Sequence, residues 1–309
     1  MQASPRARMP RTSRVGTLLL STCLAALAAT GMPADAAGLA DLGDEFNDAA
    51  SLASWSRFHE VYGWPDKARQ LDVDTTTPGA LYLEPYDSAW VRDLHAPYLY
   101  KTVAGDFDVR ARVRVRGKQT PAPTDTWALG GLLARFPGMQ TARTWEPRRE
   151  NWMFITTGIG ERPGEVMTET KSTVNSDSSL KLRPFASGWV ELRLVRVGSA
   201  FIALARAEGD SAWRVRDRFH RMLAPPQLQV GLVAYTTSKA NTQPGPEIAD
   251  VINRQVPTHL PTDMILEVDW IRFAEPKVSY PKDWYTGVSA NHLTDSSTSD
   301  AELLRLLGS

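Results

Sequence analysis

Two stretches of the chain combine aromatic rings with ionic side chains at close spacing. The first spans residues 62–95 and the second spans residues 143–152. A flat indole or phenol ring packs against the C–H face of a pyranose, and a few fixed polar groups hydrogen-bond its hydroxyls. The sequence therefore predicts a saccharide-binding groove that both stretches edge. Its predicted binding residues are Trp64, Tyr86, Asp87, Trp90, Arg92, His95, Trp145, Glu150 and Trp152.

The same stretches leave a catalytic interpretation open, either as a glycoside hydrolase or as a polysaccharide lyase. Hydrolysis of a glycosidic bond uses two carboxyl groups, about 5 Å apart for retention and about 6.5–9.5 Å apart for inversion. A histidine titrates near neutral pH, but a binding or structural role is favoured for His95. Catalytic residues stay unassigned, and the candidates are Asp87, Asp93, Glu146, Glu150, Arg92 and His95.

Other function classes find little support. The remaining histidines are scattered without the spacing of zinc ligands. The Gly-x-Ser-x-Gly, phosphate-loop and dinucleotide-binding motifs are absent from the sequence. The 35 Lys and Arg balance 35 Asp and Glu, whereas nucleic-acid binding needs a basic excess. We therefore expect no nucleic-acid partner.

The first 36 residues have the layout of a secretory signal peptide. A basic stretch precedes an apolar stretch from Val15 to about Thr30, and Ala34-Asp35-Ala36 offers a cleavage site after Ala36. The apolar stretch is short for a membrane span. The sole cysteine, Cys23, lies inside it, so the exported chain would lack disulfides; lipidation at Cys23 is the less favoured alternative. We predict a secreted or periplasmic bacterial protein.

Alternating hydrophobicity dominates the rest of the chain. From Phe107 to Val115 apolar side chains point one way, while Asp108 and three arginines point the other, which is typical of a half-buried antiparallel strand. Ten such segments and almost no helical periodicity predict an all-β sandwich or barrel. The predicted strands span residues 79–84, 97–103, 107–115, 128–136, 151–158, 164–173, 188–197, 200–207, 228–237 and 264–274.

Turn residues separate these strands. Gly105-Asp106 lies between two of them, and Gly198-Ser199 joins two others as a two-residue hairpin. Ser299 and Glu302 form a capping box that would start a short helix in a peripheral tail. Long loops are predicted at 117–126, 137–150 and 238–262. The expected divisions are a signal peptide (1–36), a sandwich domain (37–284) and a polar C-terminal tail (285–309).

Several motifs resemble the concanavalin A-like lectin/glucanase superfamily, and within it the C-terminal modules of some β-xylosidases. They cover roughly residues 44–274. The resemblance implies a two-sheet antiparallel jelly-roll β-sandwich with long loops, a concave face that receives a glycan, and adjacent first and last strands. The motifs are Asp44-Glu45-Phe46-Asn47-Asp48, Asp87-Ser88-Ala89-Trp90, Gly105-Asp106-Phe107-Asp108-Val109, Gly130-Gly131-Leu132-Leu133-Ala134-Arg135, Glu150-Asn151-Trp152 and Leu266-Glu267-Val268-Asp269-Trp270.

The resemblance also bears on metal and catalysis. Some related modules hold calcium near their terminal strands, which would make Asp48 and Asp269 the metal ligands here, although two carboxylates fall short of the six to eight oxygens that calcium takes. The Glu-x-Asp-x-x-Glu motif of sandwich glucanases is absent, because Glu267-Val268-Asp269 is followed by Arg272 at the third position. A structural calcium is the one expected cofactor.

An arginine ladder and three further tryptophans complete the candidates. Arg110, Arg112, Arg114 and Arg116 share one strand face; they could grip an acidic polysaccharide, but pairing with Asp or Glu on neighbouring strands is favoured. We assign Trp55, Trp189 and Trp270 to the core. The preferred function is a secreted, monomeric carbohydrate-binding protein, and an interaction protein without a sugar ligand is the least favoured.

Overall fold

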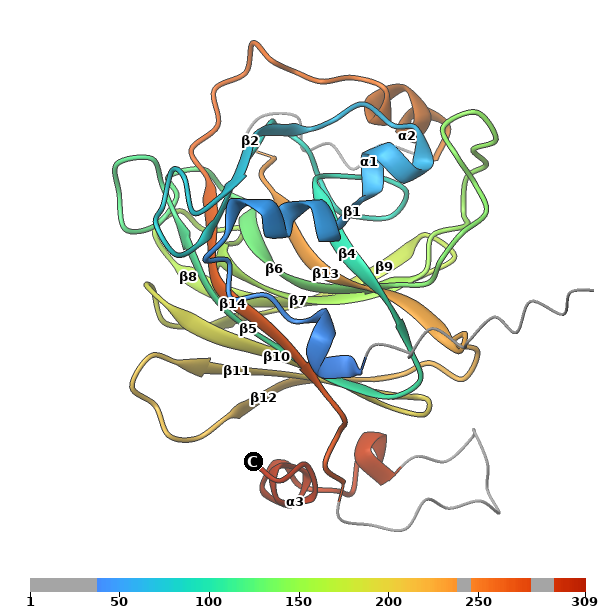
Figure 1. Cartoon of the computed structure of the whole chain (residues 1–309). Helices are drawn as coiled ribbons and strands as arrows, with labels where there is room; N and C mark the ends of the chain where they lie inside the picture. The colour runs from blue at the N-terminus through green and yellow to red at the C-terminus, as the bar shows by residue number, and fades with distance from the viewer. Residues whose placement is uncertain (1–37, 238–245, 279–291) are drawn as a thin grey trace, which may run out of the picture. The chain divides into compact units, whose positions relative to one another are not determined.

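The computed structural model describes residues 38–237, 246–278 and 292–309, and the predicted signal peptide lies outside them. Their strands form two seven-stranded sheets in which neighbouring strands run antiparallel. Sheet 1 has the order β1-β4-β13-β6-β7-β8-β9, and sheet 2 has the order β12-β11-β10-β5-β14-β3-β2. Figure 1 shows the sheets stacked face to face, as in a β-sandwich.

The strand bounds are as follows. Sheet 1 contains β1 (Ser56–Arg57), β4 (Tyr98–Ala104), β13 (Gln227–Tyr235), β6 (Ala128–Arg135), β7 (Trp152–Ile159), β8 (Val166–Val174) and β9 (Asp177–Pro184). Sheet 2 contains β12 (Arg214–His220), β11 (Ala200–Ala207), β10 (Val190–Val197), β5 (Phe107–Arg116), β14 (Ile265–Ala274), β3 (Leu81–Pro85) and β2 (Ala68–Val73).

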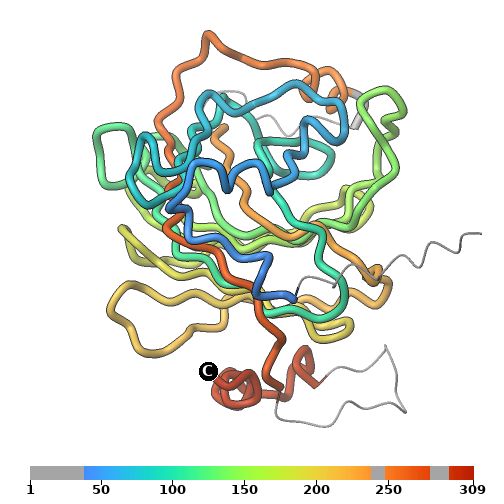
Figure 2. Tube along the Cα trace, viewed as in Figure 1, coloured from blue at the N-terminus to red at the C-terminus, as the bar shows by residue number. Residues whose placement is uncertain are grey.

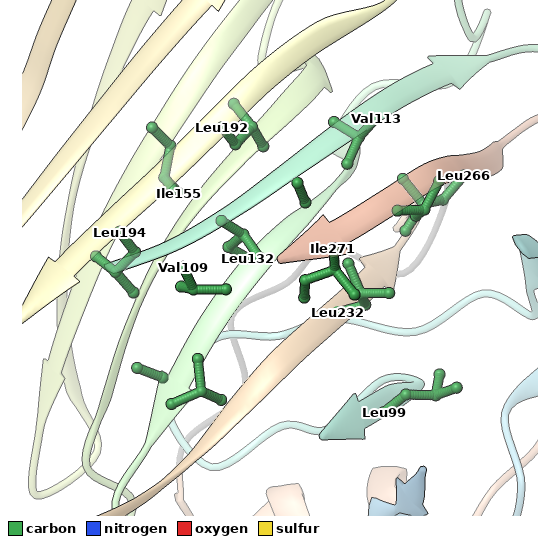
Figure 3. Close-up of a cluster of buried hydrophobic side chains, with 14 of the residues drawn as sticks. Leu99, Val109, Val113, Leu132, Ile155, Leu192, Leu194, Leu232, Leu266 and Ile271 are labelled. Carbon is green, nitrogen blue, oxygen red and sulfur yellow. The ribbon is translucent and has the colours of Figure 1, made fainter. Parts of the chain in front are cut away.

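The main core lies between the two sheets. Strand β5 contributes Val109 and Val113 from one face, and these belong to the same buried cluster as Leu132 and Leu232 of sheet 1 (Figure 3). All four side chains are completely buried. Because burying a Val or Leu side chain contributes about 1.5–3 kcal/mol, the alternation seen in the sequence is enough to direct these strands into a sandwich.

The ten predicted strands are confirmed, and their ends agree within two residues. They correspond to β3 to β8, β10, β11, β13 and β14. The sequence did not predict β1, β2, β9 or β12. All four are edge strands: β1 and β9 lie at the two edges of sheet 1, and β2 and β12 lie at the two edges of sheet 2.

The predicted turns connect the strands in two different ways. Gly198 has a φ of 58° and joins β10 to β11 as a hairpin, in which Val197 pairs with Ala200. Gly105, with a φ of 74°, instead carries the chain from β4 in sheet 1 to β5 in sheet 2. The first segment of the sandwich domain lies beside its last strand, β14 (Figure 2). Asp44 and Ile271 exchange two backbone hydrogen bonds of 2.8 Å there.

The helices are short. Helix α1 (Phe58–Tyr62) and helix α2 (Pro246–Asn253) lie over sheet 1 in Figure 1. Helix α2 corrects the prediction of a continuous loop over 238–262. Among the described residues, no helix is long and apolar enough to cross a membrane. The 3-10 helices are η1 (Leu39–Leu42), η2 (Ala49–Ser54) and η3 (His292–Thr294).

Helix α3 (Asp300–Leu306) lies at the C-terminus. It begins after Ser299, whose Oγ accepts a hydrogen bond from the Glu302 backbone nitrogen at 3.2 Å. Its Leu303 and Leu306 are buried with Ile202 of β11 on the outer face of sheet 2. The end of the chain therefore belongs to a core cluster, where the sequence suggested a peripheral tail.

Candidate functional site

The outer face of sheet 1 carries a second core, which we call the aromatic cluster. Strands β4, β7 and β13 supply some of its rings, while α1 and the loops supply the others. The centroid of Trp90 lies 5.4 Å from that of Phe58 and 5.4 Å from that of Tyr98, with the rings edge to face. Such pairs add about 0.5–1.5 kcal/mol beyond area burial. The cluster comprises Phe58, Tyr62, Trp64, Trp90, Tyr98, Tyr100, Trp152, Phe154 and Tyr235.

Loops close over this face, and helix α2 fixes them. The side chain of Asn253 is completely buried; its Oδ1 accepts from the His95 backbone nitrogen at 2.9 Å, and its Nδ2 donates to the Asp93 carbonyl at 2.7 Å. Lys67 Nζ donates to the His95 carbonyl at 3.1 Å, and burial lowers the pKa of Lys67 to about 8. We call residues 58–66, 86–97, 142–150 and α2 the loop cover.

A buried ion pair ties the loop cover to the sheet. Arg135 of β6 makes two hydrogen bonds of 2.7 Å to the carboxylate of Glu150 and a third, of 2.8 Å, to Gln229. Burial alone would raise the pKa of Glu150, but the charge and hydrogen bonds of Arg135 outweigh it and hold that pKa well below its usual range. Glu150 is therefore ionised at neutral pH and cannot serve as a general acid.

His95 packs in the same place, between Phe58 and Trp64, with centroid distances of 4.7 and 5.2 Å. Its Nε2 lies 3.6 Å from Glu150. Burial lowers the pKa of His95, and the attraction of Glu150 offsets only part of this effect. The imidazole is therefore neutral at pH 7, which suits a packing role better than that of a base accessible to substrate.

Folding stability should consequently fall in mild acid. The unfolded chain gains a proton at His95 below about pH 6.5, whereas the folded chain resists it. We expect the free energy of unfolding to drop by up to about 2 kcal/mol from pH 7 to pH 5 on account of this residue. Urea unfolding measured at both pH values should show a smaller drop in His95→Gln. An unchanged drop in that variant would contradict the assignment.

A second buried ion pair lies beside Trp90. Lys171 Nζ is 2.8 Å from Glu169 Oε1 and donates to the Trp90 carbonyl at 3.3 Å. The hydroxyl of Tyr235 donates to the other oxygen of Glu169. Burial raises the pKa of Tyr235 well above its usual value. These groups are therefore paired with one another inside the covered face.

The structure buries the rings that were predicted to stack on sugar. Trp90 and Trp152 are completely buried, and Trp64 is 7% exposed. His95 and Glu150 are buried as well. This corrects the prediction that these five side chains line an open groove: the rings pack against one another beneath the loop cover, so a saccharide cannot reach their faces.

The other four predicted binding residues have different surroundings. Trp145 is partly buried against the aromatic cluster. The guanidinium of Arg69 lies 4.5 Å over the ring of Tyr86, and Asp87 is buried. Of the nine predicted binding residues, only Arg92 lines the open groove that adjoins the loop cover.

That groove has a volume of about 510 Å³ and lies between the loop cover and the turn from β8 to β9. Its size falls within the range of small-molecule sites, about 300–1,000 Å³. We call it the arginine groove, because Arg92 and Arg148 line it and neither guanidinium has a hydrogen-bond or ion-pair partner among the described residues. Its lining residues are Val91, Arg92, Asp93, Leu94, Arg148, Val174, Asn175, Ser176, Asp177 and Ala249.

The backbone around both arginines is strained and tightly held. Arg92 has a φ of 54° and Arg148 a φ of 64°, values uncommon for residues other than glycine. The buried carboxylate of Asp93 accepts hydrogen bonds from the Arg148 backbone nitrogen at 3.1 Å and from the Ser176 hydroxyl. The Arg92 nitrogen donates to Ser178 Oγ at 2.9 Å. Strain of this kind persists where the surroundings enforce it, and it clusters at functional sites.

The opposite wall of the groove is a β-hairpin. Val174 pairs with Asp177 across a two-residue turn, in which Asn175 and Ser176 have φ values of 48° and 65°. Positive φ at both central residues is the mark of a type I′ turn. The turn thus presents Asn175 and Asp177 to the groove next to the two arginines.

A smaller cavity of about 30 Å³ adjoins this groove, and Val91 lines both. Its walls include Trp127, Lys171 and Tyr235. The side chain of Trp127 is partly exposed, and its backbone φ is 52°, an outlier for a bulky residue. Trp127 is partly exposed and lines a cavity. A ring that stacks on a sugar needs both of these properties.

Sequence reasoning missed most of the groove. Arg148 lies in the second aromatic and ionic stretch but was not chosen, and Asn175 and Asp177 fell between a predicted strand and an unassigned segment. One signal was available, since Asn followed by a small polar residue between alternating segments is typical of a hairpin turn. Nothing local in the sequence indicates that this turn meets residues 91–94.

The arginine ladder is paired, as the favoured interpretation held. Arg114 and Arg116 both contact Glu267 of β14, at 2.6 and 2.8 Å, and Arg112 contacts Asp269 at 2.7 Å. Arg112 also contacts Glu208, at 2.5 Å. Because three carboxylates pair with these three guanidinium groups, the ladder offers little to an acidic polysaccharide.

Two of the three tryptophans that we assigned to the core have partly exposed side chains on sheet 2. Trp55 is buried, but Trp189 and Trp270 are not fully so. Arg112 lies 4.6 Å over Trp189, and Arg272 lies 4.2 Å over Trp270. The prediction is therefore wrong for these two, which stack against arginines.

The carboxylates predicted to bind calcium have other partners. Asp48 caps helix η2 and accepts from the Ala50 nitrogen at 2.9 Å, whereas Asp269 is paired with Arg112. An adjacent guanidinium is a poor neighbour for a divalent cation, and the described residues contain no group of three or more potential metal ligands. The donor set does not fit calcium, and the calcium site stays a prediction from resemblance.

Comparison with known proteins adds information about the fold. No family model matches the chain, and no curated protein matches it. A solved structure of the GH43 protein BlXynB from Bacillus licheniformis aligns with a TM-score of 0.50 at 11% identity, over 75% of this chain and 39% of that one. The sheets follow the same architecture. The chain has a concanavalin A-like jelly-roll fold.

Two further solved structures align with lower TM-scores. A protein of unknown function from Saccharomyces cerevisiae aligns with a TM-score of 0.48 at 12% identity, over 73% of this chain and 98% of that one. A β-1,3-glucanase from Mycobacterium marinum aligns with a TM-score of 0.42 at 13% identity, over 77% of this chain and 100% of that one. At these identities the likeness concerns the fold.

Proposed function

We propose that this chain is an exported carbohydrate-binding protein whose saccharide site is the arginine groove. One observation carries the proposal: Arg92 and Arg148 line an open groove without partners, while their backbones are held in strained conformations by Asp93 and Ser178. Polar side chains that extend from such an ordered backbone into a concave site can orient a ligand. Trp127, at the adjoining cavity, supplies an aromatic surface.

Binding is better supported than hydrolysis. A glycosidase needs one carboxyl group with a raised pKa that can donate a proton. The carboxylate of Asp93 is buried and used in structural hydrogen bonds, and Arg135 lowers the pKa of Glu150. Neither group suits the role of the acid.

Lyase chemistry finds no better support. Tyr98 is buried, donates to the carbonyls of Leu133 and Gln229, and has a pKa raised well above its usual value by burial. His95 is buried beneath the loop cover. Neither side chain can reach a proton on a bound saccharide in this arrangement.

A steric variant tests the location of the site. Val174 lines the groove and is 50% exposed, so Val174→Trp should fold normally while its indole occupies the groove. We expect wild-type protein to be retarded in native gels loaded with at least one polysaccharide, and Val174→Trp to lose at least about tenfold in affinity, as a displaced hydrogen-bonded ligand would.

Met222→Trp is the matched control, because Met222 is 56% exposed and does not line the groove. It should bind like the wild type. If both variants bind equally well, the saccharide site lies elsewhere; if no polysaccharide retards the wild type, the proposed function fails. Export is part of the proposal, and N-terminal sequencing of protein recovered from the periplasm or medium should begin at Ala37.

A further inference from the structure

We infer that the arginine groove selects acidic saccharides, with Arg92 and Arg148 binding the carboxylate of a uronic acid residue. This inference rests on the proposed function and names its ligand class. Guanidinium groups bind carboxylates through paired, charge-assisted hydrogen bonds. Two of them on one groove wall would discriminate strongly between a uronate and a neutral sugar.

The charge state of the groove supports this selection. Elsewhere in the described chain many arginines are engaged: Arg112 and Arg114 contact carboxylates at 2.7 and 2.6 Å. In the groove, by contrast, Arg92 and Arg148 have no acidic partner among the described residues. The nearest buried carboxylate in sequence, Asp93, accepts from backbone and hydroxyl donors instead of from their guanidinium groups.

Asp93 thus acts as a positioning residue. It holds the backbone of Arg148 directly and, through Ser176, the turn of the facing hairpin. Val91 and Leu94 close the tight turn that carries Arg92, with a backbone hydrogen bond of 2.9 Å. Since these backbones are already ordered, less conformational entropy is lost when a ligand binds.

The hairpin wall is suited to the rest of a saccharide. Asn175 offers an amide, and the Asp177 carboxylate accepts hydrogen bonds from hydroxyl groups. A polyanion without hydroxyl groups would leave Asn175 and Asp177 without hydrogen-bond partners. The groove therefore matches a uronic acid residue, which carries one carboxylate and several hydroxyl groups.

Calorimetric titration with oligosaccharides of equal length tests this inference. The probes are oligogalacturonate and alginate oligomers, sulfated carrageenan oligomers, neutral cello-, xylo- and laminari-oligosaccharides, and polyglutamate. We expect uronate oligomers to bind at least about tenfold more tightly than neutral ones, and Arg92→Gln or Arg148→Gln to weaken this binding at least about tenfold. Arg162→Gln, whose side chain is 76% exposed and does not line the groove, should bind normally.

The titrations distinguish failure of acidic selection from failure of saccharide binding in the groove. Neutral sugars that bind as well as uronates, with loss in Val174→Trp but not in the two Arg variants, would keep the saccharide site and overturn acidic selection. Equal or tighter binding of sulfated oligomers would overturn the uronate assignment. If polyglutamate bound as tightly as the uronate oligomers, the groove would recognise negative charge alone. That result would overturn the inference.

Discussion

Replacing Trp90 by Ala should lower the free energy of unfolding by about 3–5 kcal/mol, the usual cost of removing a fully buried tryptophan. Its indole is completely buried and contacts Phe58, Tyr98 and Trp152. The loss should come from a cavity at the centre of the aromatic cluster. Guanidinium unfolding, followed by far-UV circular dichroism, measures it.

Trp270→Ala provides the comparison. This ring is partly exposed on sheet 2 and stacks under Arg272, so its removal should cost far less than that of Trp90. The account of the covered face would be wrong if Trp90→Ala unfolded like the wild type but lost saccharide binding, because that result is expected of an exposed stacking ring.

Breaking the buried ion pair between Arg135 and Glu150 should lower the free energy of unfolding by as much as Trp90→Ala does. Arg135→Met leaves the carboxylate of Glu150 buried without its partner, and a broken buried pair typically costs about 3–5 kcal/mol. Burial then raises the pKa of Glu150 in the folded state. Because a raised pKa favours the folded state at low pH, the loss measured at pH 7 should shrink near pH 4.

The double variant Arg135→Met/Glu150→Leu separates charge from packing. Replacing both partners by apolar side chains is often neutral, so it should recover most of the loss. Recovery will be incomplete, because Gln229 loses the hydrogen bond that Arg135 donates. Losses that simply add in the double variant would mean that the two residues do not interact.

The strands that the sequence revealed are those with strong alternation or continuous apolar runs. Strand β5 alternates strictly, and β6 is buried along its whole length. The strands that it missed lack this pattern. Strand β9 carries mostly polar, exposed residues and β12 is rich in charge; an edge strand is stabilised by hydrogen bonds to one neighbour, which leave little trace in hydrophobicity.

The burial of the tryptophans could not be deduced from their neighbours. Trp90 stands beside charged residues, which suggested a rim, yet the ionic groups near it are themselves paired and covered: Glu150 with Arg135, and Lys171 with Glu169. Glu150 lies in the loop that follows the strand of Arg135, and Lys171 lies two residues after Glu169 on β8. Pairing of this kind offsets part of the cost of burying charge. The local sequence therefore showed which residue types gather in this region, but it did not predict that their side chains are buried.

The groove depends on contacts that are still less local. Arg92 lies in the loop between β3 and β4, and Arg148 lies in the loop between β6 and β7. They line one groove because both loops lie beside the β8–β9 hairpin that carries Asn175. Asp93 links two of these segments, through Arg148 and Ser176. A single sequence carries no signal for such a meeting, although each segment taken alone could be assigned as a loop or a turn.

The location of a bound saccharide tests the central claim most directly. Hydrogen–deuterium exchange of the wild-type protein, with and without the tightest-binding oligosaccharide, should show new protection confined to residues 91–94, 148–149 and 174–178. Protection there supports a ligand in the arginine groove. Protection of residues 98–104 and 152–159 of the covered sheet, with residues 174–178 unchanged, would contradict it.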